Sequence, residues 1–131
     1  MITINNRVAD SKAILIVEDD EAIRESLSIW LTDFGWTVKA AESAAKALEF
    51  EKPFDTYIID QNLKDREGFS LVEELWSRYG RVPVIIMSGY LDKELRNDAL
   101  SRGVVGILKK PFHLEEINRI LASIHKKKRG G

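Results

Sequence analysis

TYIIDQNLKDREG, residues Thr56–Gly68, is the stretch that decides the fold, because it takes one carboxylate, Asp60, from an apolar strand into a turn. An ionised carboxylate at the end of a buried strand costs several kcal/mol unless a cation lies beside it. The rest of the sequence must therefore supply a cationic partner. The two candidates are a metal ion held by further acids and a lysine side chain.

Both candidates occur, each at the end of its own apolar run. Glu18 and Asp19 follow residues 14–17, and Lys110 follows residues 104–108. Short continuous apolar runs are consistent with buried strands. We therefore expect residues far apart in the sequence to converge at one edge of a sheet.

Composition limits the kind of protein that these residues can form. The 131 residues fit one domain, and 20 basic against 21 acidic residues leave a net charge of -1, which favours neither nucleic acid nor membrane as a partner. The absence of cysteine excludes disulfides, thiol catalysis and cysteine-based zinc sites. No apolar run approaches the roughly 20 residues of a membrane span. We expect a cytoplasmic protein.

Hydrophobic periodicity predicts five strand–helix pairs in alternation, which is typical of an α/β fold with a parallel sheet covered on both faces. The pattern at 36–40 alternates, whereas the other strands read as continuous apolar runs, so we place 36–40 at an edge. We expect a flexible leader at 1–12, a domain at 13–125, and a basic tail or the start of a linker at 126–131. The expected strands are 14–17, 36–40, 57–59, 82–87 and 104–108, and the expected helices are 23–34, 43–51, 69–79, 92–102 and 114–124.

Ligands of open parallel α/β sheets bind outside the carboxyl ends of the strands. The polar residues that follow the apolar runs all fall there: Glu18, Asp19, Asp60, Ser88 and Lys110. Three carboxylates at one edge repel one another, and a hard divalent cation relieves this repulsion. Mg²⁺ commonly binds one or two carboxylates together with a phosphate, so we expect Mg²⁺ as the cofactor.

This arrangement suits a phosphoryl transfer in which a carboxylate is the nucleophile. A carboxylate oxygen can attack phosphorus to give an acyl phosphate, and Asp60 is our candidate nucleophile. Catalysis of such a step is mostly positioning and charge stabilisation. Mg²⁺, the Lys110 ammonium, and the Ser88 hydroxyl with a backbone amide would each take one phosphoryl oxygen, and Gly89 carries no side chain to block the approach.

Four ordered motifs, ILIVEDD, IIDQNLKDREG, VIIMSG and ILKKPF, resemble the receiver domain of two-component response regulators over about residues 13–124. The resemblance implies a flavodoxin-like, doubly wound five-stranded parallel sheet of order 2-1-3-4-5 in three α/β/α layers, an order for which a chemotaxis receiver is a standard example. It also implies a cis bond between Lys110 and Pro111. The site roles that it implies are Asp60 as phosphoacceptor, Asp19 as direct Mg²⁺ ligand, Glu18 as an acid acting through water, Asn62 as a backbone carbonyl ligand, Ser88 as switch hydroxyl, and Lys110 as phosphoryl contact.

The resemblance further implies a signalling domain that catalyses its own phosphorylation and dephosphorylation, and not an enzyme acting on other substrates. The phosphodonor would be a sensor histidine kinase or a histidine phosphotransfer protein. Output would pass through the face formed by the 92–102 helix, the 104–108 strand and the 114–124 helix, to a downstream protein, to an effector domain outside this chain or to a second copy in a homodimer. We expect neither nucleic acid nor membrane to be a partner of this domain.

Two positions depart from the family pattern. Ile107 stands where the family usually has Tyr or Phe, so the aromatic side chain that reports phosphorylation is missing there; Tyr90 either substitutes for it or gates access to the site. Lys64 stands where a proline is common, which loosens the turn after Asp60. Neither departure touches the phosphorylation chemistry.

Competing interpretations concern single residues and the whole fold. Asp20 suits a helix N-cap, and Lys109 suits a solvated surface. A flavodoxin-like cofactor binder needs a phosphate-binding loop after the first strand, and the EDDEA segment at that place has no glycine. An aspartyl-phosphate phosphatase needs its nucleophile after the first strand, whereas the candidate nucleophile here follows the third strand. A receiver fold used as a fixed docking module would lack Mg²⁺ binding. The KKKR run near the C-terminus favours a solvated end or linker over nucleic-acid contact.

Overall fold

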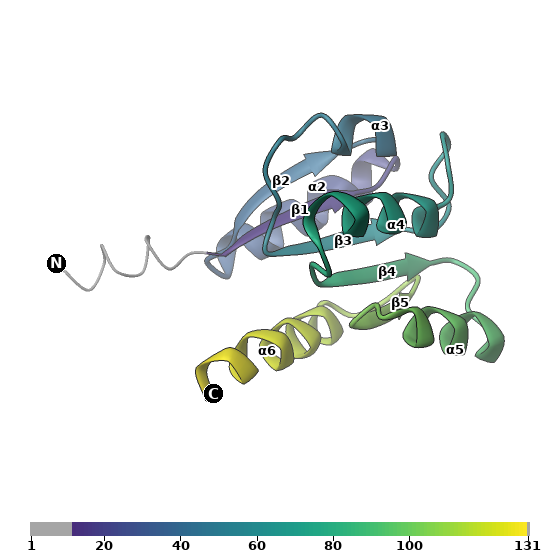
Figure 1. Cartoon of the computed structure of the whole chain (residues 1–131). Helices are drawn as coiled ribbons and strands as arrows, with labels where there is room; N and C mark the ends of the chain where they lie inside the picture. The colour runs from purple at the N-terminus through teal and green to yellow at the C-terminus, as the bar shows by residue number, and fades with distance from the viewer. Residues whose placement is uncertain (1–11, 131) are drawn as a thin grey trace, which may run out of the picture.

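A parallel five-stranded sheet of order β2-β1-β3-β4-β5 forms the centre of the protein (Figure 1). The computed structural model describes residues 12–130, and the side chains of residues 12–124. The order is the predicted 2-1-3-4-5, and the expected edge strand does lie at an edge, as β2. The strands are β1 (Ala13–Val17), β2 (Thr37–Ala41), β3 (Thr56–Asp60), β4 (Val84–Ser88) and β5 (Gly106–Lys109).

Helices cover both faces of this sheet and give the predicted three-layer α/β/α arrangement. Side chains of α2 and α6 pack with one set of strand residues, and side chains of α3, α4 and α5 pack with the other set. The confirmed fold class is therefore flavodoxin-like and doubly wound. The helices are α2 (Glu21–Asp33), α3 (Ala44–Ala47), α4 (Gly68–Tyr79), α5 (Lys93–Arg102) and α6 (Leu114–Gly130).

The alternation of strand side chains explains the two cores. In β1, Ile14 and Ile16 pack toward α2 and α6, whereas Leu15 and Val17 pack toward the opposite layer. Successive side chains of a strand point to opposite faces, so a strand covered on both sides must be apolar throughout. Burying one such side chain contributes about 1.5–3 kcal/mol. The continuous apolar runs thus place β1, β3 and β4 in the middle of the sheet.

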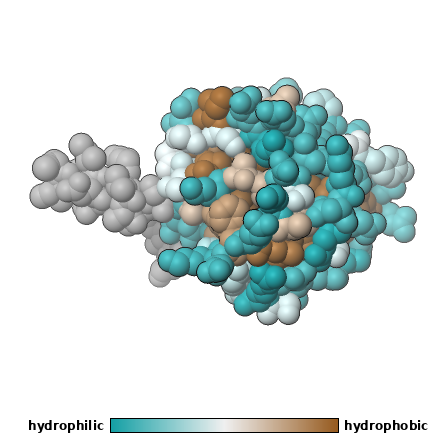
Figure 2. Space-filling model, turned by 90° about the horizontal axis from the view of Figure 1, so that it is seen from above, coloured by the Kyte–Doolittle hydropathy of each residue, from teal (hydrophilic) through white to brown (hydrophobic). Residues whose placement is uncertain are grey.

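The edge strand β2 is the most exposed strand, with only Ala41 buried. Seen from above, the molecule shows mostly hydrophilic side chains, with a smaller apolar area exposed among them (Figure 2). The strand begins at Thr37, one residue later than predicted, and Trp36 packs beside it against the core under α2 and α6. The alternating pattern is followed only in part: Trp36 and Val38 pack against this core, whereas Ala40 is exposed and Ala41 is buried in the core on the opposite face.

Helix α3, predicted at 43–51, is shorter than predicted. Ser43 caps α3 as expected, accepting a hydrogen bond from the Lys46 amide, but the helix ends at Ala47 and not near residue 51. Side chains of α4 bind the backbone that would have continued it: the Arg78 guanidinium donates to the Leu48 carbonyl and the Tyr79 hydroxyl donates to the Phe50 carbonyl. Tertiary contacts thus replace helical hydrogen bonds in this segment.

The last helix is longer than predicted, because α6 continues past residue 124 to Gly130, through most of the expected basic tail. The predicted flexible leader at 1–12 lies outside the described residues except for Lys12. The division into leader, domain and tail remains a prediction. Within residues 12–130, no helix combines the length and the apolarity that crossing a membrane requires.

Candidate functional site

Backbone hydrogen bonds carry the sheet past its strand ends and fix the predicted site residues at one edge. The Glu18 amide donates to the Ala41 carbonyl at 3.0 Å, and the Lys110 amide donates to the Ser88 carbonyl at 2.8 Å. Asp60 itself is the last residue of β3 and pairs with Met87 of β4. The side chains at this edge are therefore positioned by the sheet and not by mobile loops.

Three of the predicted residues form an acidic cluster. Glu18, Asp19 and Asp60 each offer a carboxylate oxygen, and these atoms lie within 4.8 Å of one another. Glu18 and Asp60 are buried, at 0% and 3% exposure, whereas Asp19 is partly exposed. An all-oxygen donor set open to solvent on one side suits Mg²⁺, which retains several waters. The residues present thus fit the expected cofactor.

Lys110 supplies the cationic partner that the sequence required. Its Nζ lies 2.7 Å from Glu18 Oε1 and 3.2 Å from Asp60 Oδ2. Burial acts to lower the pKa of the Lys110 ammonium, but the hydrogen bond to Glu18 and the charges of Glu18 and Asp60 outweigh it, and the pKa is raised. The lysine therefore stays protonated beside the acids. The expected cis bond between Lys110 and Pro111 is present.

Glu18 is the most deeply enclosed of the acids. Burial raises the pKa of the Glu18 carboxyl, and the nearby Asp60 charge adds to this effect, against the hydrogen bonds from Lys110 and the Asp20 amide. The Asp20 amide donates to Glu18 Oε2 at 3.0 Å, and the Arg24 guanidinium donates to the Glu18 carbonyl oxygen at 2.8 Å. Both Glu18 carboxylate oxygens thus have partners within the protein. Asp20 also caps α2, as predicted, by accepting from the Ile23 amide.

The turn after Asp60 packs closely against the end of β3. The Asn62 amide donates to Asp60 Oδ1 at 3.3 Å, and the Gly68 amide donates to the Gln61 carbonyl at 2.8 Å. A Cβ atom added to Gly68 would lie 2.6 Å from the Asp60 carbonyl oxygen, closer than real Cβ contacts allow. Gly68 therefore permits α4 to begin directly against Asp60.

Ser88 is buried next to the acidic cluster, and its hydroxyl bonds within its own turn. Its Oγ donates to the Tyr90 carbonyl at 2.6 Å and accepts from the Tyr90 amide at 3.2 Å. The Tyr90 ring is 71% exposed, and its hydroxyl donates to Asp92 Oδ2. Ile107 is buried in the core beside α5. The side chain that replaces the family's aromatic residue is thus part of the packing.

The structure places the other candidates as follows. Lys109 is exposed at the end of β5, whereas Lys110 turns to the acids. Asn62 is exposed at the rim of the cluster. Sequence reasoning missed Arg24, Gln61 and Asp65, whose contacts hold the edges of the site, because their roles depend on tertiary neighbours that no local pattern encodes.

Comparison with known proteins agrees with this geometry. The response regulator receiver domain family matches residues 14–122 of the chain. Over 108 residues the chain is 34% identical to a protein of Rickettsia felis described as an NtrX-like response regulator; the match covers 79% of this chain and 23% of that protein. The chain thus corresponds to about a quarter of the length of this relative.

Two solved receiver structures share the fold. The non-phosphorylated HemR receiver domain from Leptospira biflexa has a TM-score of 0.81 and 28% identity, over 87% of this chain and 94% of that one. A CheY-like response regulator receiver domain protein from Methanospirillum hungatei has a TM-score of 0.82 and 27% identity, over 93% and 100%.

Fold, site and comparisons together define a signalling domain built on a parallel α/β sheet with an acidic edge. The chain belongs to the response regulator receiver domain family of two-component systems.

Proposed function

We propose that this receiver accepts a phosphoryl group on Asp60 from a sensor histidine kinase or a histidine phosphotransfer protein, with Mg²⁺ as cofactor. The observation that carries the proposal is the buried Asp60 carboxylate at a strand end, with Lys110 Nζ at 3.2 Å and two further acids within reach of one cation. A carboxylate held beside a fixed ammonium is a competent nucleophile.

In the proposed transfer, an Asp60 carboxylate oxygen forms a bond to phosphorus while the bond from phosphorus to the donor's imidazole nitrogen breaks. The electron pair of that bond goes to the nitrogen, and the product is an acyl phosphate on Asp60. Bound Mg²⁺ would neutralise charge on the phosphoryl oxygens. Lys110 lies close enough to contact a second oxygen, and Asn62 holds the Asp60 carboxylate through its amide. Water attack on the same phosphorus would return Asp60 to its free state.

Phosphorylation would compete for the Ser88 hydroxyl. In the structure this hydroxyl donates to the Tyr90 carbonyl, and a phosphoryl oxygen on Asp60 offers a charged acceptor instead. Release of the Tyr90 turn would move the segment that leads into α5, of which only Ala99 is buried. A shift from 1:99 to 99:1 needs roughly 5.5 kcal/mol, to which charge-assisted bonds at Ser88 and Lys110 would contribute.

The proposed output surface consists of α5, β5 and α6. A groove there is lined by side chains of both signs, among them Arg96, Lys109, Glu116 and Arg119. This surface would bind a downstream protein, an effector domain of a longer chain, or a second copy of the receiver. We place the protein in the cytoplasm and residues 13–125 in the receiver unit as parts of the same proposal.

The phosphodonor would dock on the other side of the acceptor. A groove of about 640 Å³ lies between α2 and the segment that follows β5, next to Lys110, and is lined by Ile23, Leu27, Pro111 and Phe112 among others. Its lining is largely apolar and adjoins the charged edge, which suits a helical partner that presents a phosphorylated histidine. Docking there would bring the donor histidine to the open side of Asp60.

The test is phosphorylation by a small donor. The protein is incubated with acetyl phosphate and Mg²⁺ and weighed intact by mass spectrometry, beside Asp60→Asn and beside the parent in excess chelator. We expect one phosphoryl group on the parent with Mg²⁺ and none in the other two samples. Equal modification of Asp60→Asn would show that another residue is the acceptor.

A further inference from the structure

The turn between β3 and α4, residues 61–67, makes a contact that reaches a different element of the fold. Asp65 Oδ1 accepts a hydrogen bond from the Ala44 amide at 3.1 Å, and Asp65 Oδ2 accepts one from the Ala45 amide at 3.0 Å. Both amides belong to the first turn of α3. Figure 1 shows this turn rising beside α3.

Apart from the Gln61 amide, which donates to the Met87 carbonyl of β4 at 2.8 Å, the other hydrogen bonds of the turn lead back to its own base or to α4. Asn62 and Glu67 form an antiparallel bridge, and the Phe69 amide donates to Gln61 Oε1 at 3.1 Å. Arg66 donates to Ser70 and Glu74 of α4. These contacts hold the base of the turn, whereas Asp65 connects the tip of the turn to α3.

The tip of the turn needs such an anchor because no residue there restricts the backbone dihedral angles. Lys64, which precedes Asp65, is exposed and leaves φ free, where a proline would fix φ near −65°. Two hydrogen bonds to neighbouring amides hold the next residue in one place. Burial acts to raise the pKa of the Asp65 carboxyl, but the amides of Ala45 and Ala44 outweigh it, and the pKa is lowered. Asp65 is thus an ionised anchor at neutral pH.

The same turn carries the group that orients the acceptor. The Asn62 amide, three residues before Asp65, donates to Asp60 Oδ1 at 3.3 Å. A hydrogen bond this long is near the limit of useful geometry, so a small shift of the turn would break it. Without this bond the Asp60 carboxylate would keep its Lys110 contact at 3.2 Å but would lose the donor that fixes Oδ1. The placement of the turn therefore decides how well the acids can share one cation.

We propose that Asp65 is a positioning residue for the Mg²⁺ and phosphoryl site: by tying the turn to α3, it fixes the Asn62 amide and through it the Asp60 carboxylate. This role rests on the proposed function, because it concerns the same site. Through the Ala44 and Ala45 amides, α3 would thus help to position Asp60.

The test compares Asp65→Ala with Ser43→Ala in the full chain. Ser43 also caps α3, through the Lys46 amide at 3.1 Å, and among the described residues it has no hydrogen bond to the turn, so its variant controls for loss of helix stability. Mg²⁺ binding to the unphosphorylated proteins is measured by titration calorimetry, and amide hydrogen exchange is measured for residues 61–67. Outer contacts of metal ligands typically contribute 10- to 100-fold in affinity.

We expect Asp65→Ala to bind Mg²⁺ about tenfold more weakly, at the low end of that range, and to exchange faster at Asn62. Ser43→Ala should lose stability yet keep the parent's affinity and exchange in the turn. Asp65→Asn, which retains one carbonyl acceptor, should fall between parent and Asp65→Ala. Equal Mg²⁺ affinity of parent and Asp65→Ala, or equal weakening in Ser43→Ala, would overturn the role of Asp65 alone. A parent that binds no Mg²⁺ would overturn the metal part of the proposed function together with this role.

Discussion

At the scale of single residues, Lys110 holds two buried acids together. Its ammonium contacts Glu18 and Asp60, while its own side chain is 21% exposed. Removing one partner of a buried ion pair leaves an uncompensated charge, which costs more than the pair contributes. The stability of the metal-free protein should therefore depend on this lysine.

We expect Lys110→Ala to lower the free energy of unfolding by about 2 kcal/mol in the presence of chelator, less than for a fully buried pair because solvent reaches the site. Adding Glu18→Gln to that variant should recover much of the loss, because one of the two facing charges is then gone. Urea denaturation measures both effects. Lys109→Ala, at an exposed neighbour, is the matched control and should change stability by less than about 0.5 kcal/mol. A Lys110→Ala protein as stable as the Lys109→Ala protein would contradict this electrostatic account.

Asp65 gives a prediction for acid pH. Its folded-state pKa lies below the ordinary value of 3.8, so the unfolded chain binds a proton more readily than the folded protein does. The resulting stabilisation is complete above the unfolded value and is lost as the pH falls through the folded pKa. Asp65→Asn should therefore lose less stability than the parent on acidification below 3.8, measured by urea denaturation at a series of pH values. If the free energy of unfolding fell equally with pH in the two proteins, the Asp65 carboxylate would not be held by the α3 amides.

The residues at the centre of the site could be predicted from the sequence, and the residues around them could not. Asp60, Lys110 and Glu18 each end an apolar run, and parallel strands bring such ends to one edge. Asp65 and Gln61 gave no comparable signal, because Asp65 acts through backbone amides of α3, about 20 residues earlier in the chain, and Gln61 acts through the Phe69 amide at the start of α4. Their side chains read as those of an ordinary polar turn.

At the scale of elements, the start of α4 lies directly against the end of β3. The Asp60 carbonyl lies where a side chain at Gly68 would begin. We expect Gly68→Ala to cost about 1–3 kcal/mol through overpacking and to slow phosphorylation, since the acceptor strand must shift. Thermal or urea denaturation and the acetyl phosphate reaction measure the two effects.

Gly89→Ala is the matched control for this substitution, because a Cβ at Gly89 meets no atom within 4 Å. We expect its stability to stay close to that of the parent. If the two alanine variants lost equal stability, close packing against Asp60 would not be the reason for Gly68.

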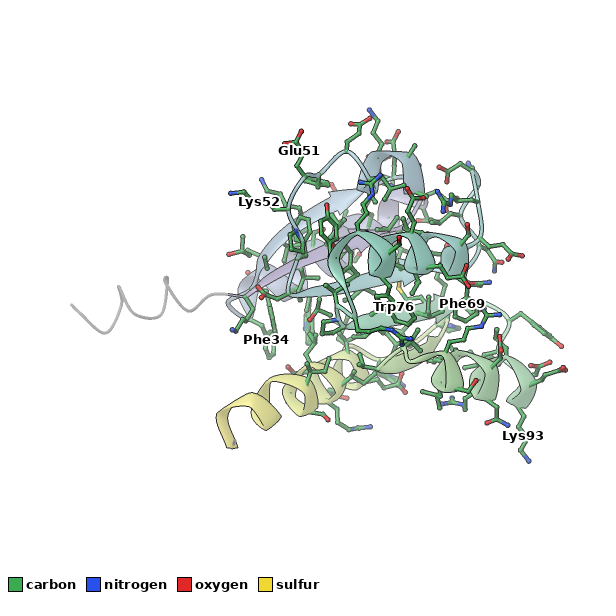
Figure 3. All side chains as sticks on the ribbon, viewed as in Figure 1. Phe34, Glu51, Lys52, Phe69, Trp76 and Lys93 are labelled. Carbon is green, nitrogen blue, oxygen red and sulfur yellow. The ribbon has the colours of Figure 1, made fainter. Side chains whose placement is uncertain are left out.

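Arg102 connects α5 to α4 through Phe69 and Glu73. The Arg102 guanidinium lies 4.8 Å from the centre of the Phe69 ring and forms ion pairs with Glu73 and Asp98. Figure 3 shows Phe69 and Trp76 on the side of α4 toward β4 and α5. Because few apolar side chains of α5 are buried, these contacts are a substantial part of what holds the helix.

We expect Arg102→Ala to destabilise the protein by about 1 kcal/mol, from one cation–π contact and exposed ion pairs. Hydrogen exchange should accelerate throughout α5 more than in α4. Arg96→Ala, at an exposed position of the same helix, serves as the control and should leave exchange unchanged. Equal exchange in the Arg102 and Arg96 variants would mean that α5 is held by its apolar residues alone.

The order and type of the elements could be predicted, whereas two helix lengths could not. Periodicity identified the strands because continuous apolar runs must be buried on both sides. The segment after α3 has helical composition, yet the side chains of Arg78 and Tyr79 bind its carbonyls. Competition between local and tertiary hydrogen bonds of this kind is not visible in a single segment of sequence.

At the scale of the whole molecule, the fold brings residues from four strand ends to one edge and leaves α5, β5 and α6 as a separate face. The contact of Ser88 with the Tyr90 turn lies between these two regions. We propose that Asp60 is the residue that receives the phosphoryl group. All the proposed switching depends on that step.

The most direct test locates the phosphoryl group itself. Borohydride reduces an aspartyl phosphate to homoserine, so the protein is treated with acetyl phosphate and Mg²⁺, reduced, digested and sequenced by tandem mass spectrometry. We predict homoserine at position 60, dependent on Mg²⁺. Homoserine at position 19 or at another acid, or no homoserine in a protein shown to bind Mg²⁺, would contradict it.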